Sequence, residues 1–582
     1  MIPAPRWILA EKLEPKDLCG SACISRLLQG KGLTTSDQAK EFLRPLLRRL
    51  SDPFLLPQMR EAVDRILLAL TNRERIVLYG DYDVDGVTSL ALLHEILSAY
   101  GAPPALFLPS RMEEGYGLSR EGVERCWQLH RPQLLIAVDC GTSSCVEIAD
   151  LRARGADVVV LDHHEPALRS SGFAGEPTLR SSGFAGEPKM ERPDCIALVN
   201  PKAGGDGDFS YLCSVGIVFK LCHALLKSSP LEGFDLRRRL DLVALGTVAD
   251  IVPLEGENRI LVHHGVREIA RRRLLGLSKL MDVAAVRPPV VSEHIGFRLG
   301  PRLNAAGRLT SAEKALCLLL TADEGEGAIL AAELDAQNRE RQNLEREIVL
   351  AAEARIAACN LGTGAAIVLG ARGWHPGVLG IVASRIARKY HRPTLVVGFD
   401  ESGLGKGSGR SIVGLSLVAA LNRCGKHLEK FGGHEMAAGL TMRENNFPAF
   451  AAAFEEACGE MLSAEDLELR LHLDYELTLA ELNWDLLRWH ELMQPFGNGN
   501  PQPLFLARGV EPVVAPQVLK EKHLLLRFRQ HGRQQRAIFF GGAENPLPEP
   551  PWDVAFRISA DEYQGEFRLQ MQVEAIRATA AI

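Results

Sequence analysis

Short apolar runs alternate with amphipathic stretches between residues 76 and 199. The runs at 76–79, 105–108, 134–138, 158–161 and 197–199 are dominated by the large apolar residues that buried strands favour. Between them, residues 87–100, 120–130 and 146–154 space their apolar positions as helices do. Strands that alternate with helices predict a parallel sheet covered on both faces, which places this region in the α/β class.

The rest of the chain predicts a lead-in and three further regions. More helix is expected from about 215 to 280, and residues 327–359 predict one long helix because they are rich in Ala, Glu and Arg without interior Gly or Pro. A second α/β unit follows, with strands expected at 366–369, 394–397 and 437–441. Beyond residue 467, strands expected at 504–507, 524–528, 537–540, 554–558 and 567–573 predict a small β-barrel. The expected domains are a helical lead-in (1–60), a first α/β domain (61–326), a linking helix (327–359), a second α/β domain (360–462) and a barrel domain (463–582).

Composition and charge fit a globular protein of several domains. The chain has 582 residues, 46% of them hydrophobic, so it can bury a sizeable core. Its net charge of −6 argues against a uniformly basic nucleic-acid binder, although a local basic channel would suffice. The 12 cysteines include no CxxC pair, which predicts free thiols rather than a zinc ribbon. With no signal-peptide pattern and no apolar run of 18 residues, we expect a cytoplasmic protein with no membrane contact.

One short segment occurs twice. The sequence LRSSGFAGEP at 168–177 recurs unchanged at 179–188. The repeat is too short for a solenoid, and its Ser, Gly and Pro content is typical of a loop. We interpret it as a local tandem duplication in a surface loop.

The densest group of acidic residues directly follows the first expected strand. Asp81, Asp83 and Asp85 alternate with other residues, and in extended chain they would project the same way. Converging carboxylates are costly unless a cation neutralises them. A calcium EF-hand also begins D-x-D-x-D-G, but it requires Glu at the twelfth position, which is Leu92 here. A solvated acidic turn is the ordinary alternative.

Two more polar groups follow expected strands in the same way. Asp139 comes after residues 134–138, and Asp162-His163-His164 comes after residues 158–161. The carboxyl ends of parallel strands form the edge at which open α/β sheets bind ligands. Carboxylate and imidazole ligands suit Mn²⁺, Mg²⁺ or Zn²⁺, and paired ions of this kind catalyse in-line attack on phosphorus. The residues therefore predict a metal-dependent phosphoesterase.

The motifs, in order along the chain, resemble the DHH phosphoesterase superfamily and, within it, the RecJ family of bacterial single-stranded-DNA exonucleases. They include GDYDVDG (80–86), VDCGTSS (138–144), LDHHEP (161–166), ALGTVADIVPL (244–254), GPRLNAAGRL (300–309), GWHPGVLGIVASRI (373–386), FGGHEMAAGL (431–440) and PFGNGNPQPLF (495–505). Each is weak alone, whereas their order and spacing are specific. The resemblance implies a DHH domain, a DHHA1 domain and an OB-type barrel.

The resemblance also implies roles for individual residues. The implied metal ligands are Asp81, Asp83, Asp85, Asp139, His163 and Asp250. Asp139 would bridge two ions, and His164 would lie near the scissile phosphate, so the implied catalytic residues are Asp139, His163 and His164. From the residues alone, Asp250 would read as a helix cap. The implied substrate contacts are Arg111, Arg302, Asn304, Arg308, Ser408, Arg410 and His434.

Two regions of the chain have residue types that suit contact with phosphate or with a DNA strand. Arginine matches phosphate oxygens, and a Gly-rich loop at 403–409 would expose backbone N–H groups to phosphate; a flexible turn is the alternative. In the barrel region, Arg527, Phe528, Arg529, Arg533 and Arg536 form a locally basic run. That run predicts a strand-binding groove, with a solvated strand face as the alternative.

The sequence departs from the family pattern in two places. Cys213-Ser214 stand where the family usually has smaller residues, which we expect to affect packing more than chemistry. The repeat at 168–188 is absent from the family pattern and follows the DHH motif, where it could affect access.

The resemblance implies a 5′→3′ exonuclease that hydrolyses single-stranded DNA to nucleoside 5′-monophosphates, in recombination and repair, with two Mn²⁺ or Mg²⁺ ions. It also implies a single-stranded-DNA-binding protein as a partner, and we expect a monomer. One alternative is a DHH phosphodiesterase of short oligonucleotides or cyclic dinucleotides, which usually lacks the barrel. Another is an inactive DNA-binding scaffold, which should have lost metal carboxylates that this chain keeps.

Overall fold

The computed structural model describes residues 5–11, 14, 16–109, 114, 117–166, 192–204, 208–544, 546–563 and 566–579. The chain divides into two compact units. One, here called the aspartate unit, comprises residues 41–338 and 493–501. The other, here called the barrel unit, comprises residues 1–40, 339–492 and 502–582. Arg111 and the repeat at 168–188 lie outside the described residues.

A five-stranded parallel sheet forms the centre of the aspartate unit, in the order β3-β2-β4-β5-β6. Every residue of β2 and β4 is buried, which is why these strands read as unbroken apolar runs. The strands are β2 (Ile76–Gly80), β3 (Ala105–Phe107), β4 (Leu134–Val138), β5 (Asp157–Leu161) and β6 (Ala197–Val199). The predicted parallel α/β sheet is confirmed.

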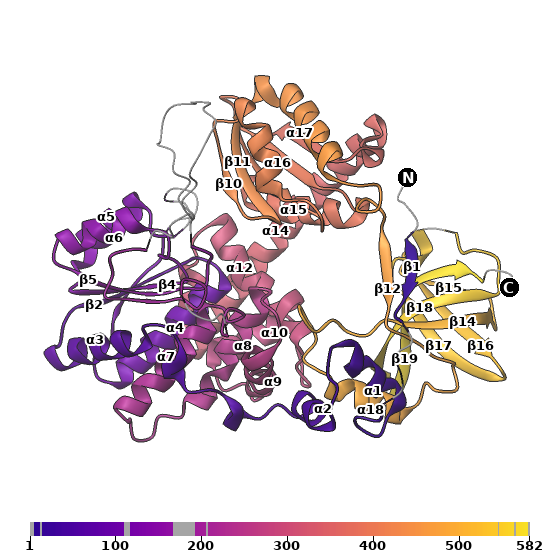
Figure 1. Cartoon of the computed structure of the whole chain (residues 1–582), viewed down its shortest axis with the longest axis horizontal. Coiled ribbons are helices and arrows are strands. Elements are labelled where there is room, and N and C mark those ends of the chain that lie inside the picture. Colours follow the sequence, from indigo (N-terminus) through magenta and orange to yellow (C-terminus); the bar gives the residue numbers. More distant parts are fainter. Residues whose placement is uncertain are drawn as a thin grey trace, which may run out of the picture. The chain divides into compact units, whose positions relative to one another are not determined.

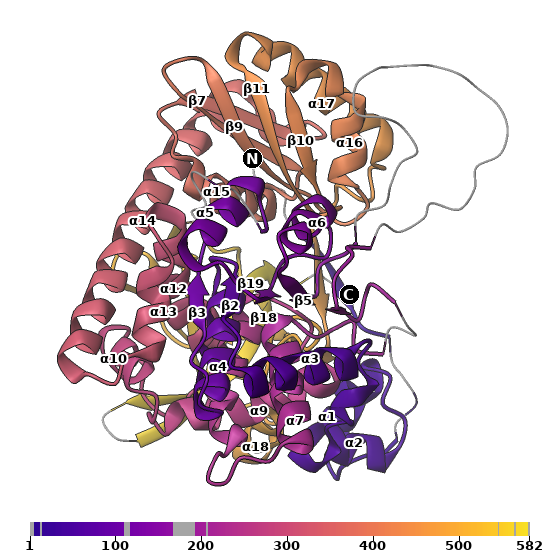
Figure 2. The ribbon, with the colours of Figure 1, turned by 90° about the vertical axis from the view of Figure 1, so that its left-hand side faces the viewer.

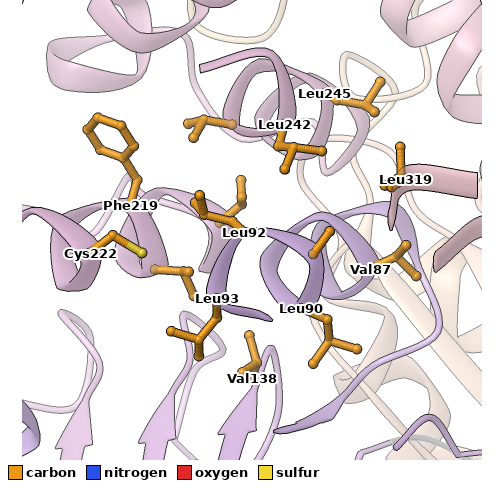
Figure 3. Close-up of a cluster of buried hydrophobic side chains, with 14 of the residues drawn as sticks. Val87, Leu90, Leu92, Leu93, Val138, Phe219, Cys222, Leu242, Leu245 and Leu319 are labelled. Atoms are coloured by element: carbon orange, nitrogen blue, oxygen red, sulfur yellow. The ribbon is translucent and has the colours of Figure 1, made fainter. Parts of the chain in front are cut away.

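Helices cover both faces of this sheet (Figure 1). One face packs on α3 (Met59–Asn72), α4 (Val84–Ala99) and α7 (Ser214–Ser228), and the other packs on α5 (Arg120–His130) and α6 (Cys145–Ala153). Helix α4 is apolar nearly all round because it lies between the sheet and a second helical layer. Figure 3 shows Leu92 and Leu93 of α4 among Phe219 of α7 and Leu242 and Leu245 of α8 (Leu240–Ala249).

The remaining helices of the aspartate unit form this second helical layer or pack around it. They are α8 (Leu240–Ala249), α9 (Gly256–Ala270), α10 (Leu275–Val283), α11 (Ser292–His294), α12 (Gly300–Leu309) and α13 (Glu313–Leu320). Helix α14 (Glu324–Cys359) begins in the aspartate unit and ends in the barrel unit. It is one continuous helix, as the sequence predicts (Figure 2). Among the helices described, none has the length and apolarity needed to cross a membrane.

The barrel unit contains a five-stranded mixed sheet in the order β10-β11-β9-β8-β7. Its strands are β7 (Ile367–Arg372), β8 (Thr394–Phe399), β9 (Leu404–Arg410), β10 (Lys430–Gly433) and β11 (Ala437–Arg443), and its helices are α15 (Pro376–Tyr390), α16 (Leu417–Arg423) and α17 (Phe447–Met461). Strand β9 is a central strand that pairs with both β8 and β11.

The expectation of a Gly-rich loop at 403–409 is therefore wrong. The backbone N–H groups of β9 pair with its neighbours, so they do not form a phosphate-binding nest. Close packing explains the glycines of β9, because a Cβ at Gly405, Gly407 or Gly409 would lie within 2.8 Å of a neighbouring side chain. Only the side chains of this strand remain candidates for contact with substrate.

The C-terminal region closes into the predicted barrel. The ring runs β14-β18-β19-β17-β16, and β16 pairs back with β14. Its elements are β12 (Arg470–Leu473), β13 (Tyr475–Glu476), α18 (Trp484–Leu492), β14 (Phe505–Pro512), β15 (Gln517–Leu519), β16 (His523–Gln530), β17 (Arg533–Phe539), β18 (Trp552–Tyr563) and β19 (Glu566–Ala578). The lead-in has the expected helices α1 (Ala22–Gly30) and α2 (Ser36–Leu43), but it also contains β1 (Arg6–Leu9), which pairs in parallel with β12.

A candidate metal centre at the edge of the parallel sheet

The predicted metal ligands meet at the carboxyl ends of three adjacent strands. Asp81 follows β2, Asp139 follows β4 and His163 lies just beyond β5. Asp250 reaches the same edge from the C-terminal end of α8. Within the described chain, three sets of ligand atoms each lie within 4.8 Å of one another: Asp81, Asp83 and Asp139; Asp139, His163 and His164; Asp85, His163 and Asp250. Asp139 and His163 each belong to two sets, so the sets form one continuous cluster.

The triple-Asp motif reaches this cluster by a different route from the one predicted. Helix α4 begins at Val84, so the three carboxylates converge through a strand-to-helix turn and not through extended chain. Asp83 caps the helix by accepting a hydrogen bond from Gly86 N at 3.1 Å. Gly86 is required because a Cβ there would lie 2.4 Å from the carbonyl oxygen of Asp81. A helix N-terminus also favours carboxylates, which helps to explain their density here.

The N-terminus of α7 orients two of the carboxylates. Asp85 accepts hydrogen bonds from Ser214 N at 2.7 Å and from Val215 N at 2.9 Å. The Ser214 hydroxyl donates to Asp139 Oδ1 at 2.8 Å. Asp139 has a φ of 63°, a conformation that Asp tolerates better than most residues. The Ser214 hydroxyl thus contacts a candidate ligand, while the expectation that Cys213-Ser214 affects packing more than chemistry stays a prediction.

Burial makes the uncompensated cluster electrostatically costly. Burial raises the pKa of Asp85 to about 7, and the charge of Asp83 adds to this rise. Burial, with repulsion from neighbouring carboxylates, also holds the pKa values of Asp139 and Asp250 well above their ordinary range. Without a cation, several of these groups would therefore retain protons. A divalent cation would stabilise their ionised forms.

His163 is suited to the same cation. Burial lowers the pKa of His163 to about 3, so its imidazole is neutral and keeps a lone pair for a metal. Its Nε2 lies 3.4 Å from Asp139 Oδ1 and 3.5 Å from Asp250 Oδ2. Among the residues that the structure describes, neither ring nitrogen has a hydrogen-bond partner. These donors fit a hard or borderline ion such as Mg²⁺ or Mn²⁺.

Asp162 has a structural role that the sequence reasoning missed. Its buried carboxylate accepts hydrogen bonds from Thr142 N, His163 N and His164 N, and Oδ1 lies 2.7 Å from Nδ1 of His164. Burial alone would raise the pKa of Asp162, but the contact with His164 and these donors hold it below its ordinary value. Asp162 therefore fixes the orientation of the His164 ring. The only signal in the sequence was its place directly before two histidines at a strand end.

Comparison with known proteins gives consistent matches along the chain. Three family models match: the DHH family N-terminal domain at residues 75–182, the DHHA1 domain at 363–460 and the RecJ OB domain at 473–575. The single-stranded-DNA-specific exonuclease RecJ of Dickeya dadantii is 35% identical over 95% of both chains. The RecJ of Bacillus subtilis is 34% identical over 95% of this chain and 67% of its own length.

The chain belongs to the RecJ family. Among solved structures, RecJ from Thermus thermophilus in complex with Mn²⁺ matches 99% of this chain and 80% of its own chain. The TM-score is 0.82 at 31% identity. A structure of the same protein with Mg²⁺ matches with a TM-score of 0.74. The predicted fold of DHH domain, long helix, DHHA1 domain and OB barrel is thus that of RecJ.

Two of the substrate contacts implied by the RecJ resemblance lie beside the cluster of candidate metal ligands. Asn304 and Arg308 of α12 line a pocket of about 310 Å³. The Asn304 Oδ1 accepts a hydrogen bond from Val84 N at 3.2 Å, which ties α12 to the start of α4. The other residues lining the pocket are Asp81, Tyr82, Asp83, Ala249, Asp250 and Ile251. The pocket therefore joins candidate ligands to candidate phosphate contacts.

Arg302 is placed differently from Asn304 and Arg308. Its Nε donates to Asp335 of α14 at 2.9 Å, and its Nη1 donates to Arg298 O at 2.7 Å. Arg302 is not among the residues that line the pocket. Arg302 therefore forms an ion pair that links α12 to α14. Its contact with substrate stays a prediction.

The other implied RecJ substrate contacts lie in the barrel unit. Ser408 and Arg410 project from the same side of β9, where Arg410 Nη1 lies 3.2 Å from Ser408 Oγ. Both side chains lie close to α15, since a Cβ at Gly380 would be 3.0 Å from each. His434 is exposed just after β10. Ser408 and Arg410 therefore share one surface of the DHHA1 sheet.

Proposed function

We propose that this chain is a metal-dependent exonuclease that hydrolyses single-stranded DNA in the 5′→3′ direction to nucleoside 5′-monophosphates, in DNA recombination and repair. The observation that carries the proposal is the buried cluster in which Asp139 and His163 each belong to two ligand sets. The names of the RecJ relatives support the substrate. The strand polarity and the products are expectations from the family.

The ligand assignment follows from the three sets. Asp81 and Asp83 would hold one ion, Asp85, His163 and Asp250 would hold a second, and Asp139 would contribute to both. When bound, two Mn²⁺ or Mg²⁺ ions would activate water and stabilise charge on the phosphoryl oxygens. The side chain of His164, held by Asp162, would donate a hydrogen bond to the scissile phosphate. Asn304 and Arg308 would orient the strand in the adjoining pocket.

Degradation of defined substrates tests this proposal. The full-length protein is incubated with end-labelled single strands, matched duplexes and cyclic dinucleotides, with Mn²⁺, with Mg²⁺ and with EDTA. We expect mononucleotides from single strands only, and no product with EDTA. Preferential hydrolysis of cyclic dinucleotides would instead assign the chain to the phosphodiesterase alternative, and metal-independent hydrolysis would exclude the assigned site.

Arg410 is expected to recognise the end of the strand more than to serve the chemistry. Arg410→Ala should reduce the preference for 5′-phosphorylated over 5′-hydroxyl strands by about tenfold, because it removes a charge-assisted phosphate contact. The measurement is the ratio of kcat/KM on the two strands. Arg372→Ala is the matched control, since Arg372 lies on the same sheet and pairs with Glu444. An unchanged ratio in Arg410→Ala would move end recognition to another residue, with Arg308 the next candidate.

The barrel is expected to supply affinity for long strands through its arginines. Arg527 of β16 and Arg536 of β17 are directly opposite in register, so the barrel places two cationic side chains next to each other. Phe528 is fully buried, so it is not available for stacking on bases. Arg529 is already paired with Glu511. Arg527, Arg533 and Arg536, and not Phe528 or Arg529, are thus the candidates for strand contact.

Charge removal on the barrel tests this role. Arg527→Gln combined with Arg533→Gln should weaken binding of long strands and flatten the salt slope by about 1.4, since each phosphate contact contributes about 0.7. Hydrolysis of very short strands should survive, and Arg529→Gln is the matched control. An unchanged slope would indicate a solvated strand face. Point variants are preferable to ending the chain near residue 462, because that truncation would also remove residues 493–501 from the aspartate unit.

A further inference from the structure

The loop that follows Asp250 is held by residues distant in the sequence. Leu254 N donates to Asn498 O at 2.8 Å, and Asn498 Nδ2 donates to Ile251 O at 2.7 Å. Asn498 therefore binds both ends of the 251–254 loop. Residues 493–501 lie between α18 and β14 in the sequence, yet they belong to the aspartate unit. We call the turn at residues 497–500 the clip.

The clip has the geometry of a tight turn fitted to this loop. Gly497 and Asn500 exchange two backbone hydrogen bonds, which leaves Asn498 and Gly499 at the tip. A Cβ at Gly497 would lie 2.7 Å from Leu254 Cδ1, and one at Gly499 would lie 2.8 Å from Glu255 Oε1. Gly499 also has a φ of 71°. Both glycines of the PFGNGNP motif are thus explained by close approach to the loop.

Further contacts anchor the segment that carries the clip. Arg259 is buried, stacks on Phe42 with 3.7 Å to the ring centroid, and donates to the carbonyl oxygens of Met493 and Gln494. Asn500 Nδ2 donates to Met493 O and Pro495 O. The clip is therefore fixed to the body of the aspartate unit independently of its contact with the loop.

The loop needs such support because it is strained beside a candidate ligand. Ile251 has a φ of 60°, a conformation unfavourable for a β-branched residue, and its side chain is largely exposed. A residue in this conformation persists only where the surrounding structure fixes it. Asn498 supplies that constraint, because Gly499 N occupies its Oδ1 at 3.0 Å and leaves Nδ2 to bind the Ile251 carbonyl.

We propose that Asn498 is a positioning residue for the Asp250 carboxylate, and that the clip makes the metal affinity of the site depend on the segment leading into the barrel. The proposal rests on the metal role assigned to Asp250 above. Its physical basis is that Asp250 directly precedes Ile251, whose carbonyl Asn498 holds. Releasing that carbonyl lets the loop relax and moves the Asp250 side chain away from His163.

Direct measurement of Mn²⁺ binding to the full-length protein tests the clip. Asn498→Ala should weaken Mn²⁺ binding, followed by titration with electron paramagnetic resonance, by about tenfold, as loss of a supporting group beyond the ligands does. The turnover should recover at high Mn²⁺, with the KM for DNA unchanged. Ser292→Ala is the matched control, because the Ser292 hydroxyl donates to the carbonyl of Phe496, in the same segment but outside the clip.

Two further variants distinguish a failure of the clip proposal from a failure of the metal assignment of Asp250. Gly499→Ala should reproduce the loss of Mn²⁺ affinity by forcing the turn away from Glu255 while leaving the Asn498 side chain intact. Asp250→Asn tests the ligand itself: unchanged Mn²⁺ binding in this variant would overturn the metal assignment. If Asp250→Asn weakens binding but Asn498→Ala and Gly499→Ala do not, the clip proposal is wrong. An equal loss of affinity in Ser292→Ala at the same melting temperature would also contradict it.

Discussion

Asp139→Asn is expected to lower kcat by at least about a thousandfold, because Asp139 is shared by two of the three ligand sets. Asparagine is a more specific test than alanine, because the backbone of Asp139 has a φ of 63°, a conformation that asparagine also tolerates. It can also still accept the hydrogen bond from Ser214. The variant therefore removes the charge of the ligand while leaving the backbone and the N-terminus of α7 in place.

The same substitution should stabilise the metal-free protein. The pKa of Asp139 lies well above its unfolded value, so ionisation in the folded state is unfavourable. That penalty is absent below about pH 4, where the carboxyl is protonated in both states, and it grows as pH rises. In EDTA, the melting temperature of Asp139→Asn should exceed that of the parent by an amount that increases from pH 4 to pH 8. Mn²⁺ should abolish or reverse this difference.

A graded companion variant separates ligation from packing. Ser214→Ala removes only the donor to Asp139, so we expect a loss of about tenfold, far smaller than that of Asp139→Asn. Turnover near the parental value in Asp139→Asn, at matched Mn²⁺, would contradict the shared-ligand assignment. A metal-free melting temperature lower than the parent's across the whole pH series would contradict the electrostatic account of the cluster.

The sequence predicts the parallel sheet well for a physical reason. Strands buried on both faces must be apolar at every position, so β2, β4 and residues 158–161 of β5 appear as unbroken apolar runs. Strand β9 has the opposite character, since its glycines read as a turn. They are required by contacts with β8, β11 and α16 that have no local signal in the sequence. Likewise β1 is recognisable only from its pairing with β12.

The residues of the candidate site also differ in how well the sequence alone predicts them. Asp81, Asp139 and His163 could be located because parallel strands bring their carboxyl ends to one edge. Asp250 arrives from α8, outside the sheet, so the residues alone favoured a helix cap and only the family resemblance indicated a ligand. Ser214 required the structure, because its contact with Asp139 spans 75 positions. Groups that support a ligand leave little pattern in the sequence.

The second large effect is expected at Asp162, which is not itself a candidate ligand. Asp162→Asn should lower kcat by about a hundredfold or more, because it disturbs the groups that orient His164. Oδ1 of Asp162 lies within hydrogen-bond distance of His163 N, His164 N and His164 Nδ1, and Oδ2 accepts from Thr142 N at 3.0 Å. An amide can satisfy only one of these two sides, since its NH₂ group would face either the Thr142 N–H or the donors at Oδ1. The turn that carries His163 and His164 should therefore shift, while the apolar strand β5 beneath it keeps the fold.

A double-mutant cycle decides whether Asp162 acts through His164 or only through stability. If Asp162 serves to hold the His164 ring, the double variant Asp162→Asn, His164→Ala should be no slower than His164→Ala alone, because residues that act as a unit are not additive. The measurements are kcat at saturating Mn²⁺ and the melting temperature of all four proteins. A purely structural Asp162 would instead give losses that multiply, with each loss of turnover matched by a loss of folded protein. A hundredfold fall in kcat that disappears only in the His164→Ala background would place Asp162 in the catalytic arrangement as the residue that holds His164 toward the phosphate, separate from the carboxylates that hold the metal.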